Sequence, residues 1–257
     1  MRKFLLLITI LLLSINSSIA KDMRFIQVDG ALYDKKNSPK FNNLIDKINK
    51  EKDVKFVIFT GNNISKPNPQ LLESFLVEAK ELKYPYYIVL GQKDVNKQKG
   101  LSKDEYVEIV KKNVKTHKKI TSSNYVFEKN KTIFIVLDGS KDVIPLPSGY
   151  YRPETLNWLD EQLSLHANKN VIILQHYPII PPAKKETHYT FKAEEYIKTI
   201  AKHKNIKAII SGHFDTNNEI CINDILHIST KNAPTYRVID ILDYETANPV
   251  FWSTIKE

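Results

Sequence analysis

The chain has 257 residues, of which 42% are hydrophobic and 26% are charged, so it is long enough to bury a sizeable core in one large domain. Its formal net charge is +9, but the lysines are scattered and lack interleaved aromatic residues, so we expect no nucleic-acid partner. A basic surface still favours anionic ligands. The single cysteine, Cys221, excludes an internal disulfide, and we expect its thiol to be a buried packing residue.

Residues 1–20 have the pattern of a secretory signal peptide: a basic start, a short apolar run and small residues before a cleavage point after Ala20. The alternative, a membrane anchor, is less favoured because a spanning helix needs about 20 apolar residues. We therefore expect a secreted or periplasmic mature domain, residues 21–257, with no membrane span after cleavage. Loss of Arg2 and Lys3 lowers the net charge from +9 to +7.

From residue 24 onward, short apolar runs alternate with segments of helical periodicity, which is typical of an α/β domain. The predicted strands are 25–28, 56–59, 86–90, 125–127, 133–137, 171–174 and 206–210, and the predicted helices are 41–50, 68–82, 102–112, 154–166 and 191–203. The early strand–helix–strand order implies a parallel sheet. A hairpin over 125–137 and further strands in the last fifty residues imply a second, mixed sheet.

Polar residues follow five of the predicted strands. They are Asp29-Gly30-Ala31, Gly61-Asn62, Gly91-Gln92-Lys93-Asp94, His176 and Gly212-His213-Phe214-Asp215. Side chains at the carboxyl ends of strands gather along one edge of a sheet, where α/β proteins bind ligands. A solvated loop is the plainer interpretation of any one of these segments, but their repetition predicts a common polar cleft.

The order and spacing of these segments resemble the calcineurin-like metallophosphoesterases, which carry Asp-x-His, Gly-Asp, Gly-Asn-His-Asp/Glu, a lone His and Gly-His-x-His at strand ends. Residues 134–138 and 151–159 look like the purple acid phosphatase and cyclic-nucleotide phosphodiesterase branch of that family. The resemblance covers nearly the whole mature chain. It implies a four-layer α/β/β/α sandwich of two mixed β-sheets flanked by helices. It also implies paired metal ions that activate a water for attack on phosphorus.

Three positions that carry chemistry in the family are changed in this chain. Asn62 stands at the bridging aspartate, Gln92 at the metal-binding asparagine and Lys93 at the catalytic histidine. An amide has no charge with which to bridge two cations. An ammonium binds phosphate but is a poorer proton donor than an imidazole near neutral pH. Lys93 is therefore expected at the catalytic and substrate-binding position, with a solvated loop lysine as the alternative.

The first motif has lost its histidine. If Asp29 is the aspartate of that motif, Ala31 replaces the histidine. A gapless alignment instead places Gly30 and Leu32 at the two ligand positions. In both alignments no imidazole is available there.

The last two motifs are better preserved. His176 and His213 match ligands of the second metal, and His213 is also expected to contact substrate, whereas Asp215 replaces the final histidine. The resemblance thus implies a metal site of low occupancy formed by His176, His213, Asn62, Gln92, Asp29 and Asp215. Its cofactor is a divalent ion (Mn, Fe, Zn or Mg) if the site binds one, and otherwise none is expected. Inert remnants of ancestry are the alternative for both histidines. The other histidines (His117, His166, His188, His203 and His227) are expected on the surface.

Two functions remain open from the sequence. The first is an exported phosphoesterase-family protein with a degenerate dinuclear site, which hydrolyses phosphoesters weakly or not at all and binds an anionic small molecule, a phosphate-bearing ligand or a protein partner. The second is an active phosphoesterase, acting on phosphomonoesters or nucleotides through a rearranged or single-metal centre. The missing bridging aspartate favours the first, because a two-metal mechanism has no obvious substitute for it. A purely structural scaffold is a third, less favoured interpretation.

Overall fold

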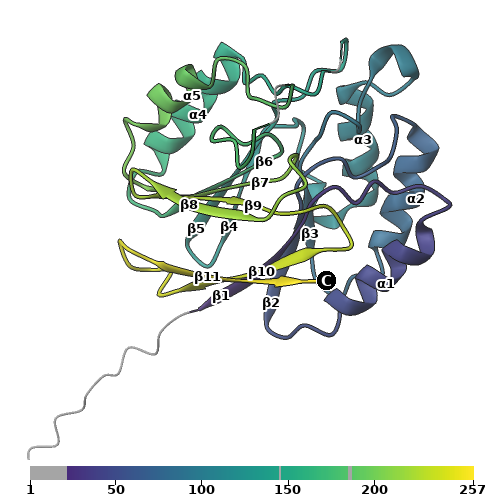
Figure 1. The fold of residues 1–257 in the computed structure, drawn as a ribbon, viewed down its shortest axis with the longest axis horizontal. Helices are drawn as coiled ribbons and strands as arrows, with labels where there is room; N and C mark the ends of the chain where they lie inside the picture. The colour runs from purple at the N-terminus through teal and green to yellow at the C-terminus, as the bar shows by residue number, and fades with distance from the viewer. Residues whose placement is uncertain (1–21, 145, 185–186) are drawn as a thin grey trace, which may run out of the picture.

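Two stacked β-sheets form the centre of the fold, and helices cover their outer faces (Figure 1). The computed structural model describes residues 22–144, 146–184 and 187–257, so the predicted signal peptide lies outside the described residues. In chain order the elements are β1 (Met23–Val28), α1 (Ser38–Ile48), β2 (Val54–Phe59), α2 (Pro69–Ala79), β3 (Tyr86–Ile88), the 3-10 helix η1 (Lys97–Lys99), α3 (Lys103–Asn113), the 3-10 helix η2 (Lys115–His117), β4 (Tyr125–Lys129), β5 (Thr132–Leu137), α4 (Pro153–Leu165), β6 (Val171–Gln175), α5 (Ala193–Ile200), β7 (Ile206–Ser211), β8 (Asn218–Ile222), β9 (Ile225–Ser229), β10 (Tyr236–Leu242) and β11 (Val250–Lys256).

Both sheets are mixed. The five-stranded sheet has the order β11-β10-β1-β2-β3, in which β1, β2 and β3 are parallel and β10 runs antiparallel to both of its neighbours. The six-stranded sheet has the order β4-β5-β6-β7-β9-β8, with a parallel centre and an antiparallel strand at each edge. The predicted hairpin is the β4–β5 pair. The parallel centres bring the carboxyl ends of β1, β2, β3, β6 and β7 to one edge of the sandwich.

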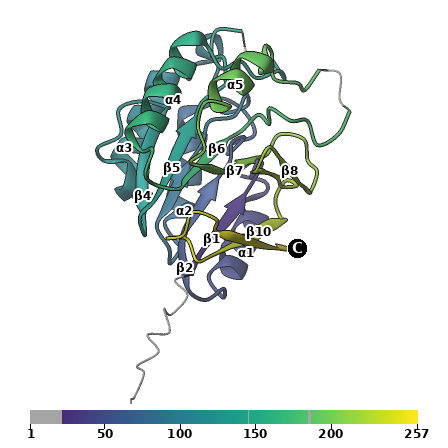
Figure 2. The same ribbon diagram turned by 90° about the vertical axis from the view of Figure 1, so that its left-hand side faces the viewer.

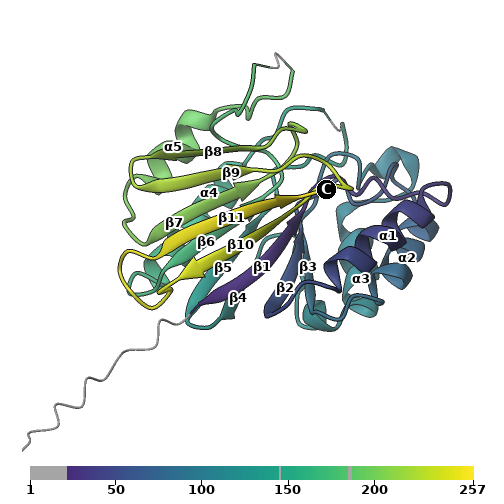
Figure 3. The same ribbon diagram turned by 60° about the horizontal axis from the view of Figure 1, so that its bottom comes forward.

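Three apolar clusters separate four layers, which confirms the predicted α/β/β/α sandwich. Helices α1, α2 and α3 lie together beside the five-stranded sheet (Figure 3), whereas α4 and α5 cover the six-stranded sheet (Figure 2). Between the sheets, Phe25 stacks on Phe56 at a ring-centroid distance of 4.9 Å, and Phe134 meets Phe56 edge-on at 5.0 Å. Because the central strands are covered on both faces, their sequences are continuous apolar runs.

Helix ends follow local chemistry. Asn68 caps α2, since its side chain accepts a hydrogen bond from the Leu71 amide at 2.8 Å, as the sequence predicts. A capping box of Ser102 and Glu105 begins α3. Helix α5 is shorter than predicted, because Lys192 has a left-handed backbone (φ 55°) that a helix cannot contain. Among the described residues, no helix has the length and apolarity to cross a membrane.

Three predictions about burial are wrong. Cys221 is exposed, because it lies on β8, an edge strand whose side chains are little covered by other elements. His117 is buried at 3% exposure, with its ring nitrogens facing the hydroxyls of Thr116 and Tyr125. His227 is buried too, on β9 between β7 and β8.

Candidate functional site

The loops after β1, β2, β3, β6 and β7 meet at one edge of the sandwich, as the sequence predicts. Asp29 follows β1, and its two carboxylate oxygens are already bonded. Oδ1 accepts a hydrogen bond from Thr60 Oγ1 at 3.0 Å, and Oδ2 accepts one from the His213 backbone N–H at 3.0 Å. Gly212 packs on this carboxylate so closely that a Cβ there would be 1.7 Å from Oδ1. Asp29 therefore joins the loops after β1, β2 and β7.

His176, at the end of β6, is fixed through both ring nitrogens. Nδ1 lies 2.7 Å from the Thr60 carbonyl oxygen, and because a carbonyl can only accept, Nδ1 carries a proton. Nε2 lies 2.7 Å from the side-chain amide of Gln92. In a neutral ring Nε2 accepts, and a rotation of the amide presents its NH2 group to it. The nitrogen that faces the loop after β3 is thus covered by Gln92.

Asn62 uses its side-chain oxygen to hold the loop after β3. Oδ1 accepts a hydrogen bond from the Lys93 backbone N–H at 3.0 Å, and Asn62 itself has a left-handed backbone (φ 52°). Gly91 lies against this amide, where a Cβ would be 2.6 Å from Oδ1. The Lys93 side chain is exposed. Asn62, in the loop after β2, therefore holds the backbone of the loop after β3 at the residue that carries the exposed Lys93 side chain.

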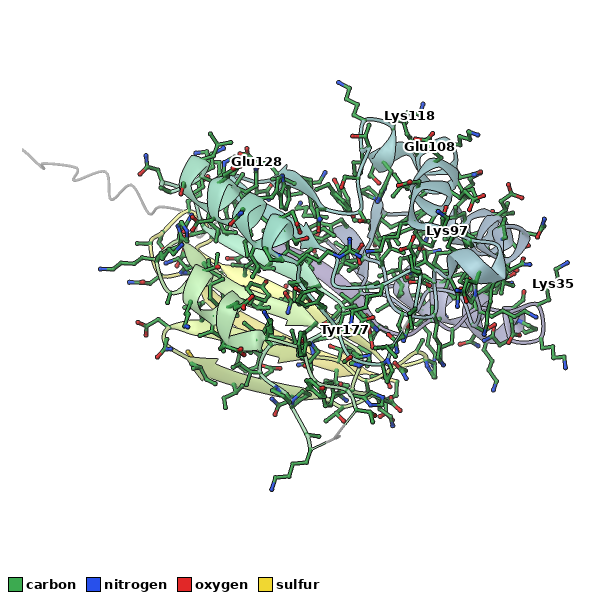
Figure 4. All side chains as sticks on the ribbon, turned by 90° about the horizontal axis from the view of Figure 1, so that it is seen from above. Lys35, Lys97, Glu108, Lys118, Glu128 and Tyr177 are labelled. Carbon is green, nitrogen blue, oxygen red and sulfur yellow. The ribbon has the colours of Figure 1, made fainter. Side chains whose placement is uncertain are left out.

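His213 is the centre of a group of rings. Its ring centroid lies 4.9 Å from that of His176 and 4.8 Å from those of Tyr177 and His188. Figure 4 shows Tyr177 in the interior of the molecule. His188, which the sequence predicts on the surface, is partly exposed and also packs against His213. Sequence patterns miss this neighbour because it lies in a loop rather than at a strand end.

Asp215 is placed differently from the other candidate residues. It is exposed, has a left-handed backbone (φ 52°), and its Oδ1 accepts a hydrogen bond from the Asn232 backbone N–H at 3.0 Å. It therefore fixes the loop after β9, whereas Asp29, Asn62 and His176 form the buried part of the site.

Asp94 is a buried positioning residue that sequence reasoning did not include among the site residues. Its carboxylate accepts hydrogen bonds from the backbone amides of Gly91 (2.8 Å) and Ile64 (3.0 Å) and from Asn63 Nδ2 (3.0 Å). Burial raises its pKa to about 6, although these donors oppose the rise. Asp94 thereby ties the loop that carries Gln92 and Lys93 to the loop after β2.

A buried polar chain leads away from the site between the two sheets. Gln27 Nε2 donates to Thr60 Oγ1 at 3.1 Å, and Gln27 Oε1 accepts from Thr230 Oγ1 at 2.6 Å. Arg237 Nε donates to the same Thr230 hydroxyl at 2.9 Å. Every donor in this chain finds an acceptor, so burying these polar groups is tolerated.

Comparison with known proteins agrees with this architecture. The family model described as calcineurin-like phosphoesterase matches residues 32–215, which is more than half of the chain. The chain belongs to the calcineurin-like phosphoesterase family. Two curated relatives carry the name probable cyclic nucleotide phosphodiesterase. The one from Moraxella catarrhalis is 24% identical over 61% of this chain, and the one from Psychrobacter arcticus is 21% identical over 65%. The matches span 56% and 58% of the length of those relatives.

Solved structures show the same fold at low identity. A dimetal phosphatase from Danio rerio has a TM-score of 0.67 at 14% identity, with 89% of this chain and 98% of that chain covered. GAP50, described as the anchor in the inner membrane complex of Plasmodium, has a TM-score of 0.60 at 16% identity, with 92% and 90% covered. At such identities the likeness establishes the fold alone.

A dinuclear metal centre, which family membership implies, does not fit this arrangement of side chains. Asn62 offers one uncharged oxygen, which already accepts from Lys93, and His176 Nε2 is covered by Gln92. Across residues 22–144, 146–184 and 187–257, no group of three or more His, Cys, Asp or Glu side chains is arranged to hold a metal ion. Divalent ions in such sites need anionic oxygen and neutral nitrogen donors that point at the ion.

Proposed function

We propose that this chain is an exported member of its family with a degenerate dinuclear site, that it hydrolyses phosphoesters weakly or not at all, and that it binds an anionic ligand. The observation that carries the proposal is the side chain of Asn62. It stands where the family's bridging carboxylate would be, has no charge, and gives its oxygen to the Lys93 backbone N–H. Two cations held close together need a shared anionic ligand.

The exposed side chain of Lys93 and the basic composition of the chain support the choice of an anionic ligand. Lys93 is exposed beside Asn62, and His213 adds an imidazole held at the end of β7. The mature chain carries a net charge of +7, obtained from +9 by removing Arg2 and Lys3. The ligand is a phosphate-bearing or other anionic small molecule, or an acidic group of a protein partner.

The alternative is an active phosphoesterase that uses a rearranged or single-metal centre. It is supported by the names of the curated relatives, which are probable cyclic nucleotide phosphodiesterases. A phosphomonoester or a nucleotide would then be the substrate.

Metal content distinguishes these two functions. We expect the mature chain, incubated with manganese and passed through gel filtration, to retain less than a stoichiometric ion, because its ligand positions are bonded to one another. A variant with Asn62→Asp and Ala31→His restores two family ligand types and should gain manganese. One or two ions retained per unmodified chain, with turnover of a phosphomonoester or a nucleotide, would favour the alternative instead.

Binding of inorganic phosphate tests the role of Lys93. We expect Lys93→Ala to raise the Kd for phosphate about tenfold, since the loss of one ammonium contact is worth roughly 1.4 kcal/mol. Lys118→Ala is the matched control, because that exposed side chain extends from the surface at a different loop (Figure 4). Titration calorimetry measures both. Equal affinities for the two variants would remove Lys93 from the site.

Export rests on the signal-like pattern of residues 1–20. We expect the chain recovered outside the cytoplasm to begin at Lys21, which intact-mass measurement checks. A recovered chain that still begins at Met1 would contradict cleavage.

A further inference from the structure

The edge strands β8 and β11 lie at the same side of the sandwich, and both carry exposed apolar side chains. β11 is the edge strand of the five-stranded sheet and β8 is an edge strand of the six-stranded sheet. Glu219 on β8 contacts Ser253 on β11, and the two strands lie one above the other in Figure 1. The exposed large apolar residues of these strands are Val250 (56%), Trp252 (66%), Ile255 (43%) and Ile220 (42%).

β11 has few of the features that keep edge strands from pairing. Natural edge strands are commonly short, or carry prolines, bulges or several charges. β11 has seven residues in the sequence Val-Phe-Trp-Ser-Thr-Ile-Lys, pairs with β10 in an unbroken register, and has its one charge at the end. Its outer edge therefore presents a row of backbone donors and acceptors to a further strand.

We propose that β11 pairs with β11 of a second copy of this chain, antiparallel, about a two-fold axis near Ser253. In that register Phe251 lies opposite Ile255 on the face between the sheets, and Trp252 lies opposite Thr254 on the outer face. Aromatic and β-branched residues are favourable cross-strand partners. Lys256 lies opposite Val250 rather than opposite another lysine. The strand is thus complementary to itself.

A second copy fits this side of the molecule better than an isolated peptide strand. A peptide would extend one sheet, whereas a copy related by an axis perpendicular to the sheets brings β8 towards β8 as it pairs β11 with β11. An interface formed by the same surface on both partners is the common form of homodimer. Glu219 of each copy is paired with Arg237 of its own chain, so the two carboxylates near the axis bring their own counter-charges.

The mass of the mature chain in solution is the first test. We expect light scattering during gel filtration to give the mass of a dimer for the unmodified chain and of a monomer for Trp252→Lys. The matched control is Val77→Lys, which adds the same charge at an apolar side chain on α2 that is also exposed (58%), and it should remain dimeric. Circular dichroism checks that both variants are folded. A monomer for the unmodified chain at every concentration used overturns the proposal.

Disulfide trapping tests the register. In a Cys221→Ser background, the double variant Trp252→Cys and Thr254→Cys places each cysteine opposite its partner in the other copy, so mild oxidation should give a covalent dimer. Lys256→Cys in the same background is the control. In the proposed register the two cysteines at position 256 are offset by six residues. At about 3.4 Å per residue they would be about 20 Å apart and should not cross-link. The proposal is also overturned if the dimer persists in Trp252→Lys and the double variant does not form the disulfide, because the two copies would then associate through another surface.

Discussion

At the scale of single residues, burial decides which protonation state the fold can hold. The His117 ring lies between the Thr116 and Tyr125 hydroxyls, and burial lowers its pKa to about 3. In the unfolded chain a histidine has a pKa of about 6.5. Between those two pH values the unfolded state binds more protons than the folded state, so stability is lost as the pH falls.

We therefore expect the free energy of unfolding to contain a His117 contribution that is complete above pH 6.5 and about 2.7 kcal/mol smaller at pH 4.5, two pH units below the unfolded pKa. The variant His117→Gln lacks the imidazole, so the difference between its free energy of unfolding and that of the unmodified chain should shrink by that amount from pH 7.5 to pH 4.5. Urea unfolding at the two pH values measures this difference. Tyr125→Phe removes a neighbouring hydroxyl but keeps the imidazole. The difference between its free energy of unfolding and that of the unmodified chain should therefore not shrink in this way.

The sequence predicts which residues come together at the site but not what they bond to. Asp29, His176 and His213 meet because they follow strands of the expected order. The contact of His176 with the Thr60 carbonyl could not be predicted, because a backbone oxygen carries it and side-chain patterns do not record backbone direction. The bond from Lys93 to Asn62 depends in the same way on the left-handed backbone at Asn62.

At the scale of elements, helix positions are predictable to within a few residues because capping chemistry is local. Asn68, Pro69 and Ser102 mark the starts of α2 and α3 in both sequence and structure. The strands after residue 215 are harder to delimit, since β8 and β11 are edge strands whose residues are mostly exposed and lack a clean apolar alternation.

We expect Ser102→Ala to lower the free energy of unfolding by about 1 kcal/mol, because it removes an N-cap oxygen that accepts from the Glu105 amide. Ser74→Ala is the matched control. That serine is inside α2 and bonds to the Gln70 carbonyl, so its replacement by the best helix former should be neutral or slightly stabilising. Urea unfolding measures both, and equal losses would show that the capping box contributes nothing.

At the scale of the whole molecule, the polar chain between the sheets joins the two halves of the sandwich. Thr230 follows β9 of one sheet, whereas Gln27 and Arg237 belong to β1 and β10 of the other, and its hydroxyl contacts both. Polar residues inside an otherwise apolar layer are costly unless all are bonded. The sheets are therefore held in one relative position by hydrogen bonds as well as by aromatic packing.

Thr230→Val keeps the shape of this side chain but removes its hydroxyl, leaving Gln27 Oε1 and Arg237 Nε without that partner. We expect a loss of about 2–3 kcal/mol in the free energy of unfolding, which is the range for buried polar groups left unsatisfied. The control is Thr121→Val, at an exposed loop position, which should change the free energy of unfolding by less than about 0.5 kcal/mol. A small effect at Thr230 would mean that water replaces the hydroxyl there.

The backbone of His213 carries a consequence for how the site tolerates replacement. At φ 72° an L-residue is strained by about 1–2 kcal/mol relative to glycine, which adopts this conformation freely. The fold needs the left-handed turn at this position, but glycine would supply it at lower cost. The chain nevertheless carries an imidazole at this left-handed position, edge-on to the ring of His176 and tilted against the ring of His188. The ring is buried against those of His176, Tyr177 and His188, so replacement of His213 by glycine would relieve the backbone strain but leave a cavity among these three side chains.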